Sequence, residues 1–99
     1  MYARHVTVKG DPARVDEVVR TQEEIVLPVL RSCTGFVAQL LLLDRARGEA
    51  IGISLWDTAE NLHASEDKVR AARQQVANAI QSADPPEVRL YELSIFEQA

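Results

Sequence analysis

Residues 36–56, FVAQLLLLDRARGEAIGISLW, decide the fold that this chain is expected to adopt. Phe36 to Asp44 and Glu49 to Trp56 are both rich in aliphatic residues, and the short segment between them contains Gly48. Two such runs joined by a short glycine-containing turn are typical of a β-hairpin. The sequence therefore predicts an antiparallel pair of strands in the middle of the chain.

A helix is predicted before this hairpin. Asp11-Pro12 is a strong helix start, because aspartate caps free backbone amides and proline suits the first helical position. Apolar residues then recur at helical spacing as far as residue 30, and only Gln22 interrupts the stripe. Pro28 lies inside this pattern and removes one backbone hydrogen bond, so we expect a kink or a break near Leu27.

A second helix is predicted after the hairpin. Asp57 or Thr58 can cap its start. Ser65-Glu66-Asp67 resembles another helix start, so a helix that is split at this point is an open alternative. Valine, isoleucine and alanine then form a stripe at helical spacing that continues to Ala83, and Asp84-Pro85-Pro86 ends the helix.

Strands are predicted at both ends of the chain, from Tyr2 to Lys9 and from Val88 to Phe96. The element order is then β-α-β-β-α-β, with residues 1–99 forming a single domain. This order predicts a ferredoxin-like plait of the α+β class, in which an antiparallel four-stranded sheet carries both helices on one face.

Alternation along the strands divides their side chains between two faces. The face expected under the helices is almost purely apolar: Val6, Val8, Phe36, Ala38, Leu40, Leu42, Ile51, Ile53, Leu55, Tyr91, Leu93 and Ile95. The face expected to be open carries His5, Thr7, Val37, Gln39, Leu41, Leu43, Ala50, Gly52, Ser54, Trp56, Val88, Leu90, Glu92, Ser94 and Phe96. Because so many large apolar groups on an open face usually mark an interface, we expect a homodimer in which two sheets pack face to face.

Composition narrows the class of partner. The chain has 15 acidic and 11 basic residues, and its basic residues form no run, which argues against nucleic acid as a partner. The longest apolar run, Leu40 to Leu43, is far too short to span a membrane. The single cysteine, Cys33, allows no internal disulfide, and no signal pattern precedes the first strand, so we expect a cytoplasmic protein.

Several segments resemble the antibiotic biosynthesis monooxygenase-like family, which belongs to the dimeric α/β-barrel superfamily of ferredoxin-like plaits. The resemblance extends from Arg4 to Tyr91 and is carried by Pro28-Val29-Leu30-Arg31-Ser32, Gly35-Phe36, Leu41-Leu42-Leu43-Asp44-Arg45 and Trp56-Asp57-Thr58-Ala59-Glu60-Asn61-Leu62. It implies oxidation of a small aromatic or quinol-type substrate by O₂ without a cofactor. The alternative that it leaves open is a non-catalytic, ligand-binding or stress-associated dimeric barrel.

The functional residues of this family carry over only in part. Oxygenases that act on polyketide quinols pair the strand tryptophan with an asparagine four residues earlier and a tyrosine six residues later. Trp56 matches that tryptophan, but Gly52 and Leu62 occupy the other two places. The places of the asparagine, tryptophan and histidine of haem-degrading relatives are held by Ala3, Ser65 and Gln75. The resemblance therefore implies no haem, and we expect no cofactor.

The candidate site residues lie on the mixed face of the sheet. Trp56 either lines a pocket and stacks on a planar substrate, or packs at the strand end with its N–H group bonded nearby. His5 is the best available base for a substrate proton, and a polar cluster at the dimer interface is the alternative. Ser54, Gln39 and Glu92 lie on the same face and would contact the substrate beside Trp56.

Other reactive residue types are better explained without chemistry. His63 has acidic neighbours at helical spacing, but a metal site needs at least three converging ligands, so a solvated helix face is the simpler interpretation and no metal is expected. Cys33 has no histidine near it in the sequence and is interpreted as a small packing residue.

Overall fold

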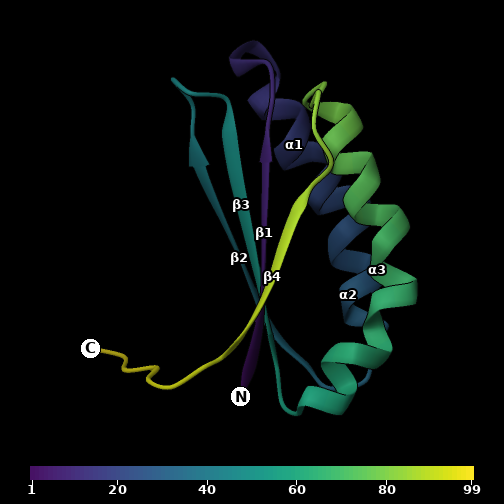
Figure 1. Ribbon diagram of the computed structural model, residues 1–99, viewed down its shortest axis with the longest axis vertical. Coiled ribbons are helices and arrows are strands. Elements are labelled where there is room, and N and C mark those ends of the chain that lie inside the picture. The colour runs from purple at the N-terminus through teal and green to yellow at the C-terminus, as the bar shows by residue number, and fades with distance from the viewer.

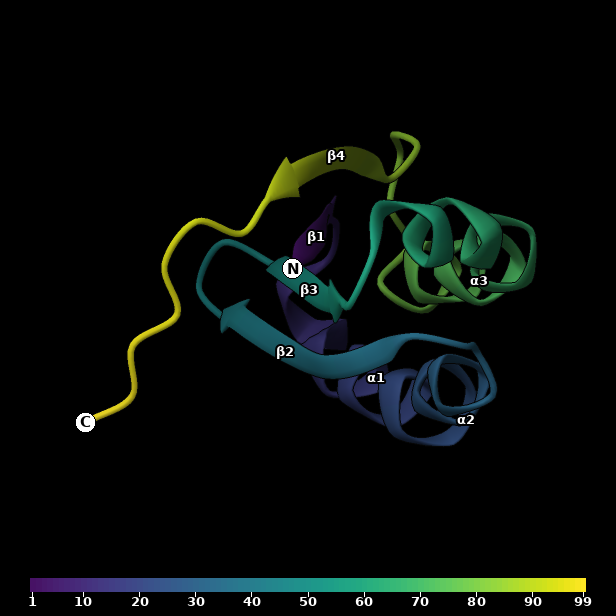
Figure 2. The same cartoon turned by 90° about the horizontal axis from the view of Figure 1, so that it is seen from below.

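The computed structural model describes residues 1–99, with an antiparallel sheet backed by helices on one face (Figures 1 and 2). Along the chain the elements are β1 (Tyr2–Lys9), a 3₁₀ turn (Pro12–Arg14), α1 (Val15–Thr21), a π-helical segment (Gln22–Val26), α2 (Leu27–Arg31), β2 (Phe36–Asp44), β3 (Glu49–Trp56), α3 (Ala59–Ala79) and β4 (Glu87–Glu92). The four strands lie in the order β2-β3-β1-β4. This topology confirms the predicted ferredoxin-like plait and the central hairpin.

The helix boundaries follow the capping signals. Thr58 is the N-cap of α3, and its side chain accepts a hydrogen bond from the backbone N–H group of Asn61. The helix runs unbroken through Ser65, so the alternative of a split helix is wrong. The interruption expected near Leu27 is a π-helical segment directly before α2, in which the N–H group of Leu27 bonds to the carbonyl of Gln22. The first helical region therefore continues past Pro28 instead of ending there.

The predicted assignment of side chains to the faces is correct for β1 and for Phe36, but wrong for the rest of β2 and for β3 and β4. Val6 of β1 lies opposite Gly52 of β3, which in turn lies opposite Leu41 of β2, so these three share the face under the helices. Leu40 and Leu42 are exposed on the other face. Tyr91 of β4 lies opposite Ala3, on that same open face. Alternation separates the two sets within a strand, but only the register between strands decides which set faces the helices.

A bulge in β2 is the one break in this alternation. The register shifts between Phe36 and Ala38, so Phe36 lies opposite Trp56 and the two aromatic rings meet edge to face at 5.7 Å between centroids. A bulge adds one residue to its strand and re-aims the side chains beside it. Phe36 therefore joins the helix-covered side, whereas Leu40 and Leu42 stay outside.

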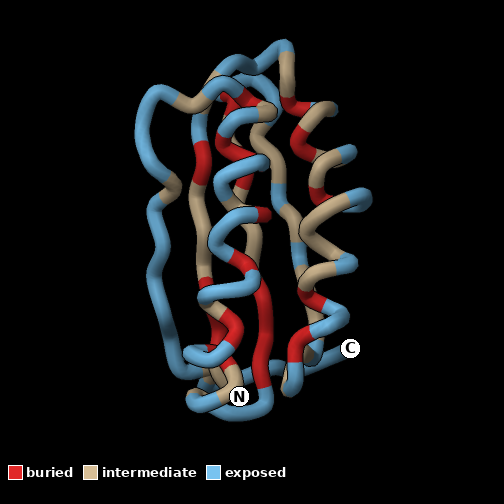
Figure 3. The backbone as a smooth tube through the Cα atoms, turned by 90° about the vertical axis from the view of Figure 1, so that its right-hand side faces the viewer, coloured by how far each residue is buried: buried red, intermediate tan, exposed pale blue.

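The core forms two clusters between the sheet and the helices, where the buried residues of Figure 3 concentrate. One cluster joins α1 and the end of α3 to the sheet and comprises Val8, Val15, Val18, Ala50, Val76, Ala77 and Ile80. The other lies near the loop before β2 and comprises Leu30, Cys33, Trp56, Leu62 and Val69. The small side chains of Ala50 and Gly52 leave space between the two clusters.

The strand β4 is shorter than predicted and lies at an edge of the sheet. It ends at Glu92, and every one of its residues is exposed. The N–H group of Leu93 still bonds to the carbonyl of Met1 at 2.9 Å, after which the chain leaves the sheet (Figure 1). None of the helices combines the length and the apolar character that a membrane span needs.

Candidate ligand-binding site

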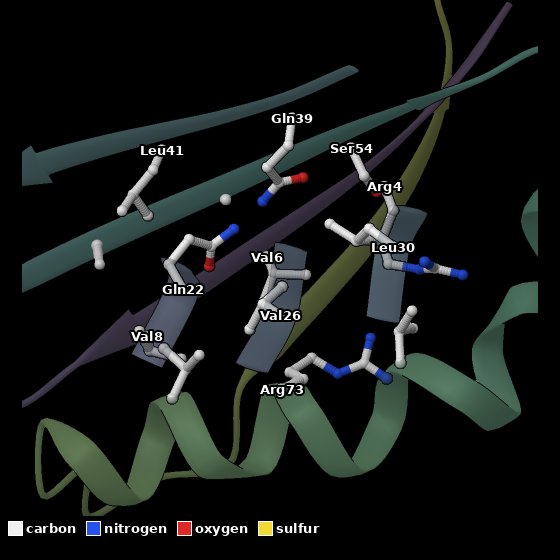
Figure 4. A pocket seen from close by; sticks show the side chains of 14 residues that line it. Arg4, Val6, Val8, Gln22, Val26, Leu30, Gln39, Leu41, Ser54 and Arg73 are labelled. Atoms are coloured by element: carbon white, nitrogen blue, oxygen red, sulfur yellow. The ribbon is translucent and has the colours of Figure 1, made fainter. Parts of the chain in front are cut away.

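A cavity lies between the sheet and the helices, in the space between the two core clusters (Figure 4). Counted with its open mouth it measures about 540 Å³. Its lining comes from both the sheet and the helices: Arg4, Val6 and Val8 of β1, Gln22, Val26 and Leu30 of the first helical region, Gln39 and Leu41 of β2, Ala50, Gly52 and Ser54 of β3, and Val69, Arg73 and Val76 of α3. A mostly apolar recess with a few polar groups is the usual form of a small-molecule site.

Two glutamines supply hydrogen-bonding atoms in the middle of this cavity. Gln22 is 6% exposed, and its Nε2 atom has no hydrogen-bond partner. The Oε1 atom of Gln39 is also buried without a partner. Figure 4 shows the two amide groups pointing toward one another from opposite walls. Buried polar atoms are nearly always paired in folded proteins, so unpaired ones that line a cavity mark a place where a ligand can bind.

The backbone around Gln22 explains how this side chain reaches the cavity. Gln22 is the first residue of the π-helical segment, and π-helical turns are rare and occur often at functional sites. Gln22 was also the only residue that broke the apolar stripe in the sequence. That interruption was a usable signal, but no pattern in the chain connects Gln22 with Gln39.

Two arginines lie at one end of the cavity, away from Val8 and Leu41 (Figure 4). Arg4 is 3% exposed, and its Nη2 atom donates hydrogen bonds to the carbonyl of Leu62 at 2.8 Å and to Ser65 Oγ at 2.9 Å. The Nε atom of Arg4 is buried without a hydrogen-bond partner. Arg4 was not predicted as a site residue, although it lies on the same face of β1 as Val6 and Val8.

The carboxylate of Glu66 links these arginines from outside the cavity lining. It accepts two hydrogen bonds from Arg73, and it also forms ion pairs with Arg4 at 3.5 Å and with Arg70 at 3.4 Å. Burial by itself would raise the pKa of Glu66, but the hydrogen bond from Arg73 and the charges of the three arginines outweigh it, so the pKa lies below its ordinary value. Burial lowers the pKa of Arg4, and the charge of Glu66 offsets part of this effect. Arginine nevertheless keeps its positive charge in proteins.

The structure brings only some of the predicted site residues to this cavity. Gln39 and Ser54 line it. Trp56 does not, because its side chain is fully buried in the neighbouring core cluster and its Nε1 atom donates to Ser54 Oγ at 2.8 Å. His5 lies on the open face of the sheet with its ring edge to face against Tyr91, and Glu92 is exposed at the end of β4.

No group of three or more His, Cys, Asp or Glu side chains is placed to hold a metal ion. His63 is exposed on α3. Cys33 is buried in the cluster around Trp56, and its thiol donates to the carbonyl of Val29 at 3.3 Å.

The chain is similar in sequence to two mycobacterial proteins. No family model matches the chain. The chain is 34% identical over 77 residues to the uncharacterized protein Rv2557 of Mycobacterium tuberculosis and 35% identical over 77 residues to the uncharacterized protein Rv2558 of the same organism. These matches cover 78% of this chain but only 34% and 33% of those proteins. The chain thus spans about a third of the length of the curated relatives that it matches.

Solved structures show the same architecture over nearly the whole chain. A monooxygenase from the gene ActVA-Orf6 of Streptomyces coelicolor, in complex with the ligand Nanaomycin D, superposes with a TM-score of 0.78 over 99% of this chain and 92% of that one, at 14% identity. The chain has the antibiotic biosynthesis monooxygenase fold. A candidate antibiotic biosynthesis monooxygenase from Deinococcus radiodurans gives a TM-score of 0.74 at 17% identity over 100% of this chain and 98% of that one.

Structures of the monooxygenase fold also include proteins without an assigned role. NE2512 from Nitrosomonas europaea, a protein of unknown function, gives a TM-score of 0.77 at 16% identity over 99% of this chain and 93% of that one. At such identities the similarity establishes the fold alone. The function must therefore be argued from the cavity and its side chains.

Proposed function

We propose that this protein is a monooxygenase-like protein that binds a small aromatic or quinol-type substrate in the cavity and oxidises it with O₂ without a cofactor. The observation that carries the proposal is the pair of buried amide atoms without hydrogen-bond partners, Gln22 Nε2 and Gln39 Oε1, within apolar walls. The apolar walls suit a ring, and the amides suit its hydroxyl or carbonyl oxygens. The ligand-bound monooxygenase of the same fold supports this proposal.

The chemistry proposed for this cavity is driven by the substrate. An anthrone-type substrate has an acidic CH₂ group. Water at the open mouth of the cavity accepts one of its protons, and the carbanion that remains can reduce O₂ directly. One oxygen atom becomes the new ring carbonyl, and the other leaves as water with the two hydrogens that the carbon loses. The protein contributes orientation through Gln22 and Gln39 and removal of water through Val26, Leu41 and Val76.

Oxygen uptake with anthrone tests this proposal. We expect uptake above the uncatalysed rate, and with ¹⁸O₂ one labelled oxygen in the anthraquinone product. Gln22→Leu with Gln39→Leu should reduce kcat/KM by roughly tenfold or more, since two orienting hydrogen bonds are lost. His5→Ala is the control and should match the wild type because His5 lies on the open face. Uptake that depends on His5 and ignores both glutamines would overturn the site assignment.

A non-catalytic ligand-binding role is the second candidate. It is favoured by the lining, which includes amides, a hydroxyl and guanidinium groups but no histidine or carboxylate to accept a substrate proton. In this case the cavity would bind the same aromatic molecules, with oxygen uptake equal to the uncatalysed rate. Binding without uptake therefore selects this candidate over the monooxygenase.

We also propose that the open face of the sheet forms a homodimer. Leu40, Leu42 and Tyr91 are exposed there, and apolar Ile51 and Ile53 lie between them. A self-complementary apolar face of this kind suits a twofold interface between two sheets. Light scattering at micromolar concentration should give twice the 11.0 kDa of one chain, and Leu42→Asp should give the mass of a single chain. A wild type with the mass of one chain would contradict the dimer.

The cytoplasm remains the proposed location. The argument is the single, buried thiol of Cys33, which has no partner for an internal disulfide. Fractionation of cells that produce the natural protein would test it, and recovery outside the cytoplasm would contradict it.

A further inference from the structure

We propose that the ligand of this cavity carries a carboxylate, which binds at the end formed by Arg4 and Arg73. The inference rests on the proposed function in one respect, namely that the cavity binds a small aromatic molecule. It adds the chemical class of that molecule, an aromatic acid with its ring on the apolar walls and its acid group at the arginines.

The charge of the lining favours an anion. Arg4 and Arg73 are the only charged side chains among the residues that line the cavity. Both are withdrawn from solvent, since the Arg4 side chain is 3% exposed and the Arg73 side chain 11% exposed. The chain as a whole has a net charge of −4, so this local excess of positive charge runs against the average of the molecule. Guanidinium groups are the protein groups best suited to bind carboxylates.

Glu66 offsets only part of this charge. It contacts Arg4, Arg70 and Arg73, and Asp67 contacts Arg70 at 3.6 Å. Two carboxylates thus face three guanidinium groups, which leaves one positive charge at the cavity end. Two buried guanidinium groups that share one carboxylate keep a net charge that is costly in a water-poor site, and a bound carboxylate would neutralise it.

A weakly engaged hydrogen-bond donor lies at the same end. The Nε atom of Arg4 is buried and makes no hydrogen bond, its carboxylate neighbour Glu66 Oε1 being 3.5 Å away, whereas Nη2 of the same guanidinium makes two hydrogen bonds. These two bonds, with Leu62 and Ser65, hold the guanidinium in place before a ligand arrives. A donor fixed in this way needs no reorganisation on binding, which lowers the entropic cost of recognising an anion.

The test compares 4-bromobenzoate with 4-bromobenzamide by NMR titration of the full chain at pH 7. The two probes have nearly the same shape, but only the acid is charged at this pH. Burial of a carboxylate costs more than burial of an amide, so the acid binds more tightly only if a cation meets it. We expect the acid to bind about tenfold more tightly than the amide, as a charge-assisted hydrogen bond would give.

A matched pair of variants locates the cation. Arg73 and Arg70 lie on the same helix and both contact Glu66, but only Arg73 lines the cavity, whereas the Arg70 side chain is 65% exposed. Arg73→Gln should bring the ratio of the two affinities to about one, and Arg70→Gln should keep it near tenfold. If Arg73→Gln does not fold, side-chain N–H signals in the wild type replace it, and the acid should shift those of Arg4 and Arg73 but not those of Arg70.

The outcomes separate the two proposals. Equal binding of both probes by the wild type, or equal losses in the two arginine variants, would overturn the carboxylate inference and leave the aromatic cavity standing. Failure of both probes to bind would overturn the proposed function and the inference with it.

Discussion

The core cluster around Trp56 and the neighbouring cavity share strand β3, but they differ in whether their polar atoms are hydrogen-bonded. Trp56 and Ser54 of β3 bond to one another, and the indole is fully buried among apolar neighbours. Gly52, two residues before Ser54, has no side chain. The amide of Gln39 lies over it, and the Oε1 atom of that amide has no hydrogen-bond partner. The Trp56 region is closed and its polar atoms are hydrogen-bonded, whereas the cavity is open and contains polar atoms without partners.

This difference shows that the most conspicuous residue of a sequence need not mark its site. A large aromatic side chain stabilises the fold mainly through the area it buries. A tryptophan whose N–H group is already hydrogen-bonded has no polar group left to bind a ligand. A ligand needs space and unpaired hydrogen-bonding groups, which small and amide side chains supply here. Variants on each side of this boundary should therefore separate stability from binding.

The largest expected effect is on the closed side. Trp56→Ala should lower the free energy of unfolding by about 3–5 kcal/mol, because it leaves a large cavity in a packed cluster. Denaturation in urea followed by circular dichroism measures this loss. Trp56→Phe is the control and should lose much less stability, since an aromatic ring still fills most of the space. A Trp56→Ala protein of unchanged stability that no longer binds 4-bromobenzoate would make Trp56 a site residue after all.

Glu66 tests the ion pairs that border the open side. Glu66→Gln should lower the free energy of unfolding by about 2 kcal/mol. This is less than the loss of about 3–5 kcal/mol expected when a fully buried ion pair is broken, because Glu66 is about a third exposed. The pKa of Glu66 is lower in the folded chain than in the unfolded chain, so its stabilisation is complete above the ordinary glutamate pKa near 4.5 and is lost as the pH falls through the lowered value.

Urea denaturation at pH 7 and at pH 3 measures this pH dependence. The difference in unfolding free energy between the two pH values should shrink in Glu66→Gln and stay unchanged in the exposed control Glu23→Gln. A stability difference between wild type and Glu66→Gln that grows toward low pH would contradict the ion-pair network.

Gly52→Val tests the space itself. A β-carbon at Gly52 would meet Gln39 Nε2 at 3.2 Å, which is the end of a flexible side chain and can move aside. Stability should change by no more than about 1 kcal/mol because valine suits a strand, whereas 4-bromobenzoate should bind roughly tenfold more weakly. Gly48→Ala is the contrasting variant, since Gly48 has a φ of 63° and its β-carbon would meet the backbone carbonyl of Gly10. It should lose stability and keep its affinity for the acid.

The smallest expected effect is a gain in stability. Gln22→Leu removes a buried atom without a partner, so the free energy of unfolding should rise by about 0–1 kcal/mol while ligand affinity falls. Thermal and urea denaturation measure the first change and NMR titration the second. A loss of more than about 2 kcal/mol would mean that Gln22 is bonded in the folded protein.

Much of the fold could be predicted because local signals agreed with one another. The hairpin, the Thr58 cap and the order of the elements follow from turn, capping and periodicity rules. The two faces of the sheet could not be assigned in the same way, because the alternating sets of β2 side chains that contain Leu40 and Leu41 are both largely apolar. Only the register, which places Gly52 opposite Val6 and Leu41, decides which set faces the helices. On β2 and β3 the more apolar set, which includes Leu40, Leu42, Ile51 and Ile53, proved to be the open one.

The site was harder to predict because it depends on what the fold leaves unfilled. Gln39 and Ser54 were recognised from their polarity, and Gln22 gave a signal by interrupting an apolar stripe. Arg4 and Arg73 gave weaker signals, because charged residues in a strand or a helix are ordinarily solvated. Their burial depends on Glu66, whose place beside both follows only from the packing of α3 against β1.

The most direct test of the central claim is a crystal structure with 4-bromobenzoate, in which the anomalous signal of bromine locates the ring. We expect bromine between Leu41, Ala50 and Val76, with the carboxylate directed toward Arg73. Bromine against Trp56 in place of the closed packing there, or on the open face of the sheet beside His5, would contradict the assignment of the cavity as the ligand site.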